Sequence, residues 1–310
     1  MKITKRAIVF GGSGFLGSHV ADALTEGGCD VTVYDIKASK HLKRSQKMVV
    51  GDIMDEKSVA KSVSGCDFVY NFAGIADIDE ATQRPLESVK YNILGNSIIL
   101  EASREAKVKR FVFASSVYVY SKAGAFYRST KQACELLIEN YHEIYGLPYT
   151  ILRYGSLYGQ RADERNYIYQ TIKSSLTARK IIREGDGEEI REYINVCDAA
   201  KGSVEILADE FANQCVIIAG DQRMKVKDLL IMIKEMLDNK TEIEFVPAKA
   251  NNHYEITPYT FAPRVARRLV SRSYLDLGQG ILSCIQDIYK EINPPPTYEG
   301  MVAKKEKNDI

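Results

Sequence analysis

The chain has 310 residues and a formal net charge of +1, and 45% of its residues are hydrophobic while 27% are charged. This balance is that of a folded protein with a sizeable core. With a net charge near zero and both signs mixed along the chain, the protein lacks an extended basic surface that would attract a nucleic acid or an anionic membrane. No window approaches the roughly 20 apolar residues that a membrane span needs, so we expect small-molecule ligands.

The N-terminus runs directly into a glycine-rich turn and lacks the long apolar region of a signal peptide. The six cysteines are scattered, with no CxxC pair and no histidine at ligand spacing. We therefore expect a cytoplasmic protein with free thiols and no bound metal.

Short apolar runs, each bounded by turn residues, predict β-strands along the first half of the chain. They are nearly continuous in hydrophobicity and rich in β-branched and aromatic residues, as strands covered on both faces are. They are residues 7–10, 30–35, 47–53, 67–74, 110–116 and 149–154. Helix-like segments lie between them, at 15–26, 86–107 and 127–145. This alternation predicts an α/β fold with a doubly wound parallel sheet of the Rossmann type.

The alternation ends after Gly159, where a mixed polar segment precedes another strand at 191–196. We therefore expect a smaller, interleaved C-terminal lobe that binds substrate. The Rossmann domain would comprise residues 1–160 and about 188–212, and the substrate lobe about 161–187 and 213–292. The tail at 293–310 has almost no apolar content, which predicts disorder.

The first predicted strand ends in the stretch FGGSGFLG, with glycines at 11, 12, 14 and 17. Glycine lets a backbone turn tightly and approach a pyrophosphate, while the following helix N-terminus supplies N–H groups and positive potential. Asp35, at the tip of the second strand, stands near the offset of about 20 residues at which an acid binds ribose hydroxyls. Because Asp35 would repel a 2′-phosphate, the pattern favours NAD over NADP.

Two further strand ends are candidate cofactor contacts. Asp52 follows the third strand and the turn 71–74 follows the fourth, so they would lie over the adenine and the middle of the cofactor. Asp52 by itself fits a solvated turn acid nearly as well.

Three tyrosines are followed four residues later by a lysine: Tyr118 with Lys122, Tyr127 with Lys131, and Tyr169 with Lys173. The first pair lies at the end of a strand, where four residues span about 13 Å, too far to act on one hydroxyl. The second opens a predicted helix, so both side chains share one inward face. The third lies beyond Gly159, away from a strand end that faces a cofactor. We therefore select Tyr127 and Lys131, against the alternative of a core tyrosine beside a snorkelling lysine.

This pair fits the removal of a hydride from a sugar carbon. The reaction needs a base for the hydroxyl proton, and a phenol with a pKa near 10 acts at neutral pH only when a close cation favours its phenolate. Lys131 would supply that charge. Ser115 and Ser116 end the fifth strand, where open α/β sheets bind ligands, and we select Ser116 as the hydroxyl donor.

In combination, these motifs resemble the extended short-chain dehydrogenases/reductases, the nucleotide-sugar epimerase and dehydratase family typified by UDP-glucose 4-epimerase. The resemblance covers roughly residues 5–290 and rests on GGSGFLG, YNILGN, FASSVYVY, the Tyr127 to Lys131 motif, LRYGSLYGQR and GDGEEIREYINVCDAA. It implies a catalytic Ser116, Tyr127 and Lys131 and a homodimer through the helices at 86–107 and 127–145.

The resemblance also implies two sets of contact residues. The NAD contacts would be Gly11, Gly14, Phe15, Leu16, Gly17, Asp35, Asp52, Ile53, Phe72, Ala73, Gly74, Asn92, Tyr127 and Lys131. The nucleotide-sugar contacts would be Ser115, Ser116, Ser156 and Arg191, of which Arg191 would hold the diphosphate.

Several positions depart from the family. Six residues, SKAGAF, separate Tyr120 from Tyr127 where the family usually has a loop of about two dozen, which predicts a wider pocket. Val117 and Tyr118 replace the Asp-Glu pair of 4,6-dehydratases, which disfavours water elimination. Ser156 stands where relatives often carry a substrate-binding Asn.

Two features, the compact FYRSTK at 126–131 and the late PYTFAP at 258–263 with DLGQG at 276–280, resemble a bacterial subgroup that modifies nucleotide-activated heptoses for surface polysaccharides. We expect NAD-dependent oxidation at C4 of a nucleotide-linked sugar, with return of the hydride in a 4-epimerase. The alternatives are a net 4-dehydrogenase, with GDP-heptose as one candidate substrate, that passes electrons to a second substrate, and a non-catalytic NAD-binding scaffold.

Overall fold

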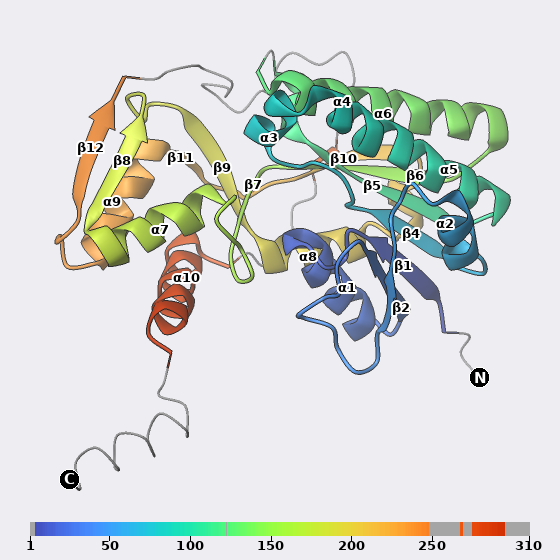
Figure 1. Cartoon of the computed structure of the whole chain (residues 1–310), viewed down its shortest axis with the longest axis horizontal. Helices are drawn as coiled ribbons and strands as arrows, with labels where there is room; N and C mark the ends of the chain where they lie inside the picture. Colours follow the sequence, from blue (N-terminus) through green and yellow to red (C-terminus); the bar gives the residue numbers. More distant parts are fainter. Residues whose placement is uncertain (1–3, 122, 248–266, 269–274, 295–310) are drawn as a thin grey trace, which may run out of the picture.

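The computed structural model describes residues 4–121, 123–247, 267–268 and 275–294. Within these residues, eight parallel strands form a sheet in the order β13-β10-β6-β5-β4-β1-β2-β3 (Figure 1). The strands are β1 Arg6–Phe10, β2 Asp30–Asp35, β3 Lys47–Val50, β4 Phe68–Asn71, β5 Arg110–Ser116, β6 Tyr149–Tyr154, β10 Gln214–Ile218 and β13 Arg267–Arg268. The doubly wound α/β fold is therefore confirmed.

The order of the strands locates a crevice at the carboxyl edge of the sheet. β1 pairs with β2 on one side and with β4 on the other, so that Phe10 lies beside Tyr34 and Asn71. The chain winds outward in opposite directions from β1 and β4. Loops that follow these two strands therefore diverge, which leaves room for a ligand at that edge.

Helices cover both faces of the sheet (Figure 1). One face carries α1 Phe15–Glu26 and α8 Val196–Glu205, whose apolar residues pack with the strands in one core cluster. The other carries α2 Glu56–Val63, α5 Gly95–Glu105 and α6 Ala125–Tyr145, which share a second cluster. Coverage of both faces explains why the strands are apolar without alternation.

The predicted helix at 86–107 is built from three pieces. After the short α3 Ile78–Gln83, the chain forms α4 Pro85–Ser88, a π-helix η1 Val89–Leu94 and then α5. A π-helical turn inside a helix is rare and frequently marks a functional site. This one contains Asn92.

A second group of elements lies beside the sheet domain (Figure 1). β7 Ser156–Tyr158, β9 Ile190–Asn195 and β11 Arg223–Lys225 form one small sheet, and β8 Lys180–Glu184 pairs with β12 Glu242–Val246 in another. The helices of this group are α7 Tyr167–Ala178, α9 Val226–Met236 and α10 Leu277–Ile292. Their apolar faces share a core cluster that is separate from both sheet-domain clusters.

One predicted boundary needs correction. The sequence assigned residue 213 onward to the smaller lobe, whereas β10 lies in the main sheet, in parallel register with β6 from Thr150 to Tyr154. A short helical turn, η3 Asp209–Phe211, leads into β10 from α8. The place of this strand in the main sheet is set by its pairing with β6, more than 60 residues earlier in the chain. The predicted disordered tail from residue 295 and the PYTFAP stretch lie outside the described residues.

Within the described part of the chain, no helix has the length and apolar character needed to cross a membrane.

Candidate active site

The glycine turn after β1 lies directly against the turn after β4. Gly11 has φ of +72°, and a Cβ at this position would approach the backbone nitrogen of Ala73 to 2.6 Å. A Cβ at Gly17 would lie 2.2 Å from the Gly11 carbonyl oxygen. Residues larger than glycine are therefore excluded at positions 11 and 17, because the nearby atoms belong to the backbone and cannot move aside as the end of a flexible side chain can.

This tight turn exposes the start of α1 toward the crevice. The helix begins at Phe15 after Gly14, and no side chain of the described residues caps it. Phe15, Leu16 and Gly17 form its first turn, where backbone N–H groups lack intrahelical acceptors and carry positive potential. This cradle fits a pyrophosphate.

Asp35 ends β2 beside the glycine turn. Its carboxylate accepts hydrogen bonds from the backbone N–H groups of Ser13 at 3.0 Å and Lys37 at 3.0 Å. The Ser13 hydroxyl in turn donates to the Lys37 carbonyl at 2.7 Å. The half-buried carboxylate is thus fixed at the strand tip, in the position from which an acid reaches ribose hydroxyls. Together with the glycine cradle, it fits NAD.

The turns after β3 and β4 occupy the predicted places at the sheet edge. The Asp52 carboxylate accepts a hydrogen bond from the Met54 backbone N–H at 2.9 Å, while Ile53 is buried against Gly95 of α5. The Asn71 side chain accepts from the Ala73 backbone N–H at 3.0 Å, which orients the turn that includes the half-buried Phe72.

Asn92 braces the turn that follows β4. Its side chain is buried, accepts from the Ile75 N–H at 2.7 Å, and donates to the Ile75 carbonyl and the Thr130 hydroxyl, both at 3.0 Å. The would-be Cβ of Gly74 lies 2.5 Å from its Oδ1. These hydrogen bonds hold the 74–75 turn against α6, and a contact of Asn92 with the cofactor stays a prediction.

Ser116 ends β5 and precedes the turn η2 Val117–Tyr120. Its hydroxyl accepts from the Tyr118 N–H at 3.3 Å. Neighbouring side chains on a strand point to opposite faces, and Ser115 accordingly turns the other way: its buried hydroxyl donates to the Glu135 carboxylate at 2.5 Å. Ser115 is therefore engaged by Glu135 on the face opposite Ser116, and its role as a substrate contact stays a prediction.

Tyr127 and Lys131 lie one turn apart near the start of α6, as the helical spacing predicts. Gly124, with φ of +95°, precedes this helix. The Lys131 ammonium donates to the Ala114 carbonyl at 2.7 Å and lies 5.8 Å from the centre of the Tyr127 ring. The Tyr127 ring in turn meets the Tyr118 ring edge-on, with the ring centres 6.2 Å apart. The structure thus brings both side chains to the end of β5 that carries Ser116.

The electrostatics of Lys131 follow from its burial. Loss of solvent lowers the pKa of its ammonium below the ordinary value, and Cys134 and Glu135 on the following turn of α6 act in the opposite direction. The faces of the Phe113 ring, at 4.8 Å, and the Tyr127 ring partly replace the lost hydration. The Lys131 ammonium is thus held between two aromatic rings at the start of α6.

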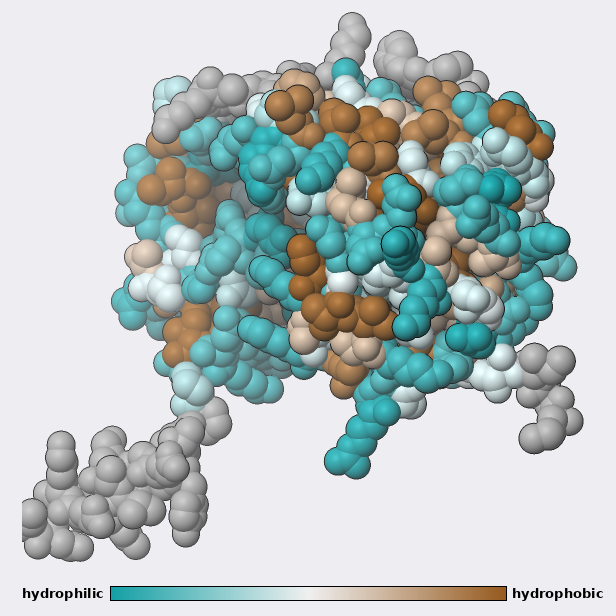
Figure 2. All heavy atoms as spheres, turned by 45° about the vertical axis from the view of Figure 1, so that its right-hand side comes forward, coloured by the Kyte–Doolittle hydropathy of each residue, from teal (hydrophilic) through white to brown (hydrophobic). Residues whose placement is uncertain are grey.

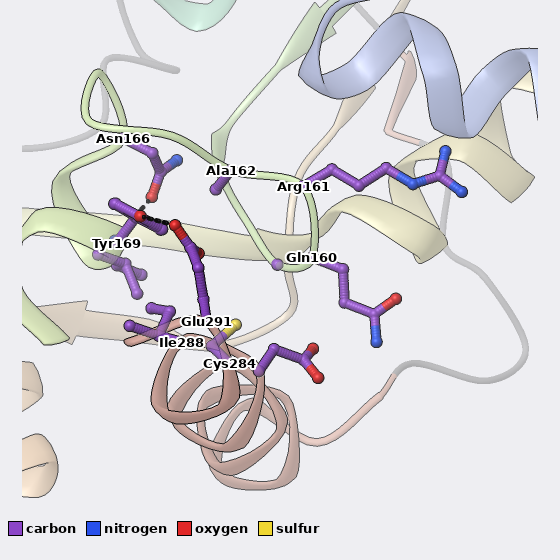
Figure 3. Close-up of a pocket in the computed structure, with 11 residues that line it drawn as sticks. Gln160, Arg161, Ala162, Asn166, Tyr169, Cys284, Ile288 and Glu291 are labelled. Carbon is purple, nitrogen blue, oxygen red and sulfur yellow. Dashed lines mark hydrogen bonds between the residues drawn. The ribbon is translucent and has the colours of Figure 1, made fainter. Parts of the chain in front are cut away.

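Of the other two tyrosine and lysine pairs, Tyr169 and Lys173 lie on α7 of the second group of elements. Lys122 is outside the described residues. Tyr169 belongs to α7, where its hydroxyl donates to Glu291 of α10 at 2.9 Å (Figure 3), and Lys173 pairs with Glu164. The contact of Tyr169 with Glu291 joins α7 to α10 and borders a cavity of about 90 Å³ between the 159–166 loop and α10.

The remaining predicted substrate contacts lie on the small sheet. Ser156 begins β7 and is in parallel register with Tyr193 of β9. Arg191 is buried on β9, and its guanidinium donates to the Ile190 carbonyl at 3.1 Å. The roles of Ser156 and Arg191 as substrate contacts stay predictions. In the described part of the chain, no cluster of three or more His, Cys, Asp or Glu side chains is arranged to hold a metal.

A buried pair that the sequence did not single out lies directly behind this region. Arg153 of β6 and Glu135 of α6 form an ion pair in which both side chains are almost fully buried. A buried carboxylate four residues after Lys131 and a buried arginine inside an apolar strand are signals that could have identified it.

Known proteins resemble this chain in sequence and in fold. Residues 7–219 match the family model described as the NAD dependent epimerase/dehydratase family. The chain is 26% identical over 269 residues to a UDP-N-acetyl-alpha-D-glucosaminuronate decarboxylase of Bacillus cytotoxicus, which covers 78% of this chain and 84% of the relative. It is 27% identical over 281 residues to a mouse dTDP-D-glucose 4,6-dehydratase, with 80% and 79% covered.

A solved structure of similar shape is that of the UDP-glucose 4-epimerase of Thermotoga maritima with UDP-glucose. It superposes with a TM-score of 0.81 at 25% identity and covers 93% of this chain and 99% of that chain. These relatives carry names of three different reactions, and what they share is the fold and the family.

Proposed function

Because the chain belongs to the NAD-dependent epimerase/dehydratase family, we propose that it oxidises C4 of a nucleotide-linked sugar with NAD as cofactor and acts as a nucleotide-sugar 4-epimerase. Bound NAD supplies the acceptor and donor of the hydride. The chain contributes the groups that bind the sugar, move its hydroxyl proton and favour the oxidised form.

The observation that carries this proposal is the convergence of Ser116, Tyr127 and Lys131 at the end of β5. Tyr127 is the base that takes the proton from the C4 hydroxyl and later returns it. Lys131, held by the Ala114 carbonyl, stabilises the phenolate that does so. Ser116 orients the sugar hydroxyl through its own hydroxyl group.

The cofactor would lie along the carboxyl edge of the sheet. The cradle formed by Gly11, Gly14 and the first turn of α1 would hold its pyrophosphate, and Asp35 would accept hydrogen bonds from its ribose. Asp52, Ile53 and the turn at 72–74 would border its adenine and central part. Lys131 would also anchor the second ribose.

The nucleotide sugar would bind between the sheet domain and the smaller lobe that contains α7, α9 and α10. Arg191 would hold its diphosphate and Ser156 would contact the sugar. The short connection from Tyr120 to Tyr127 leaves this side of the pocket open, which suits a bulky sugar.

A 4,6-dehydratase is disfavoured by the residues next to Ser116. Val117 is buried in a small apolar cluster with Ile217 and Ala219, and Tyr118 packs on Tyr127. Neither side chain is a carboxylic acid, whereas 4,6-dehydratases carry an Asp-Glu pair at these positions.

Two other functions remain candidates. A net 4-dehydrogenase would use the same three residues but pass the electrons to a second substrate, and a heptose linked to GDP is one candidate sugar for it. A scaffold that binds NAD without catalysis is disfavoured because Ser116, Tyr127 and Lys131 are all present.

We also propose a homodimer through the helices at 86–107 and 127–145, which comprise α4, η1, α5 and α6. Figure 2 shows apolar side chains on the upper part of the face where these helices lie in Figure 1. Large apolar residues with substantial exposure on this helical layer are Leu86, Val89, Leu94, Leu136, Ile144 and Tyr145. Such a patch is typical of a subunit interface. Sedimentation of the wild type and of L136E/I144E tests it.

One experiment separates the candidate functions. The purified protein is incubated with a panel of UDP-, GDP-, CDP- and dTDP-sugars, with and without a 2-keto acid as hydride acceptor, and bound NADH is followed by absorbance. An epimer formed without net NADH supports the 4-epimerase. A keto-sugar whose yield depends on the acceptor supports the dehydrogenase, and NAD binding without conversion of any sugar supports the scaffold.

A further inference from the structure

The ion pair behind the candidate active site is doubly hydrogen-bonded. The Arg153 Nε donates to Glu135 Oε1 at 3.0 Å and its Nη2 donates to Oε2 at 2.6 Å. Arg153 retains 2% and Glu135 4% of its surface exposure. Two parallel hydrogen bonds fix both the distance and the angle between the planar groups, and a single contact would fix neither.

Each member of the pair has a second partner near Ser116. Glu135 Oε1 also accepts from the Ser115 hydroxyl at 2.5 Å. The Arg153 Nη1 donates to the Tyr120 hydroxyl, and the guanidinium lies 4.6 Å from the centre of the Tyr120 ring. The four side chains therefore form one continuous buried network.

The network joins the segments that carry the proposed triad. Glu135 is one helical turn beyond Lys131 on α6. Ser115 directly precedes Ser116, and Tyr120 ends the turn η2 that follows it. Arg153 lies opposite Ser115 in the parallel register of β5 and β6, so β6 is the fixed base to which the three other segments are attached.

Stability by itself does not account for a charged pair in this place. Removing two charges from water offsets most of their attraction, and apolar residues of similar volume often stabilise a buried site equally well or better. What an apolar pair lacks is direction, because apolar packing tolerates small shifts that a bidentate pair does not.

We propose that Glu135 and Arg153 are positioning residues that set the register between α6, with Tyr127 and Lys131, and the end of β5, with Ser116. The inference rests on the proposed function of that triad and assigns to the pair no contact with substrate or cofactor. Misplacement of reacting groups by about 1 Å reduces turnover roughly 100-fold. The pair therefore acts on kcat, whereas binding of NAD and of the sugar nucleotide is left to other residues.

The decisive variant replaces both charges at once, as E135L/R153M. This removes the risk of one unpaired buried charge, which would unfold the protein for reasons unrelated to register. With the panel sugar that the wild type converts fastest, we expect kcat to fall about 100-fold. We expect KM and the affinity for NAD, measured by fluorescence, to stay within about threefold of the wild type.

Arg110 supplies a matched control at the opposite end of β5. It is also a buried arginine, and it donates to the Thr150 hydroxyl at 2.9 Å and the Ile206 carbonyl at 3.2 Å. R110M should lower the melting temperature and leave kcat unchanged below the transition. Equal losses of kcat in R110M and E135L/R153M would overturn the inference, because general loosening would then explain both.

R153K tests the positioning role even if the double variant does not fold. Lysine keeps the charge but cannot make the bidentate contact, so we expect a partial loss of kcat, about tenfold, at unchanged KM. Wild-type kcat in a folded E135L/R153M, or in R153K, would overturn the positioning role. Absence of turnover by the wild type itself would instead count against the proposed function, so the two failures are distinguishable.

Discussion

The Lys131 ammonium donates a 2.7 Å hydrogen bond to the Ala114 carbonyl and thereby ties the start of α6 to the end of β5. The bond joins residues 17 positions apart at the point where the sheet meets the cofactor crevice. Because it holds the cation near the Tyr127 ring without a water shell, the charge acts on the phenol at short range.

Y127F should abolish turnover and leave NAD bound, because it removes the proposed base and keeps the ring that packs on Tyr118. We expect a loss of at least 100-fold in kcat, within the range of general base catalysis. Y118F is the matched control, since it removes a hydroxyl from the neighbouring ring and should have little effect. The measurement is turnover of the panel sugar together with NAD binding, and the reverse ranking of the two variants would contradict the assignment.

K131M should change how the stability of the protein depends on pH. Burial lowers the pKa of Lys131 in the folded protein below its ordinary value of 10.5. At a pH between these two pKa values, Lys131 binds a proton in the unfolded chain but not in the native chain. Stability of the wild type relative to K131M therefore rises with pH across that window and is constant below it. Urea denaturation of both proteins from pH 7 to pH 10.5 measures the difference, and a difference that falls with pH would refute the burial argument.

G17A should lose NAD binding and stability together. The new methyl group would lie 2.2 Å from the Gly11 carbonyl oxygen, so the turn that receives the pyrophosphate has to move. In the control G28A, the site has φ of +84° but no atom within 4 Å of the added Cβ, and only backbone strain of about 1–2 kcal/mol is expected. Thermal melting and NAD titration should show that G28A loses stability alone.

D35A should shift the choice of cofactor. Loss of the carboxylate removes the acceptor for ribose and the repulsion of a 2′-phosphate, so the ratio of NAD to NADP affinity should fall at least about tenfold, or about 1.4 kcal/mol. D35N keeps acceptor capacity for the Ser13 N–H and should retain the shape of the turn. Titration of both variants with NAD and NADP checks this, and an unchanged ratio in D35A would exclude Asp35 as the selector.

G124A should impair turnover more than its effect on stability explains. Its methyl group would lie 2.9 Å from the Tyr118 ring and 3.1 Å from the Arg128 Cβ, which would push Tyr118 against Tyr127. G146A, at the other end of α6, has φ of +71° and open space around the added Cβ. Both variants should lose about 1–2 kcal/mol, but only G124A should lose kcat, and equal kcat in the two would contradict the role of this contact.

Local pattern was sufficient for much of the fold. Continuous apolar runs indicate strands covered on both faces, and the glycine turn with Asp35 indicates a dinucleotide cradle. Each of these signals is contained in a short segment of the chain, so it can be read without knowledge of distant contacts. The helical spacing of Tyr127 and Lys131 likewise follows from four residues of sequence. β10 could not be assigned in this way, because its place in the sheet depends on pairing with β6, more than 60 residues away.

Side-chain partners depended on contacts between distant segments. Asn92 fits a cofactor contact by motif, and in the structure it braces Ile75 and Thr130, while the strand pleat turns Ser115 toward Glu135. The sequence by itself determined the parallel sheet, the cofactor turn and the tyrosine and lysine on one helical face, since period and backbone freedom are local properties. Only the tertiary structure decided that Arg153 and Glu135 join β6 to α6, because the partner of a buried charge depends on how elements that are distant in the sequence pack together.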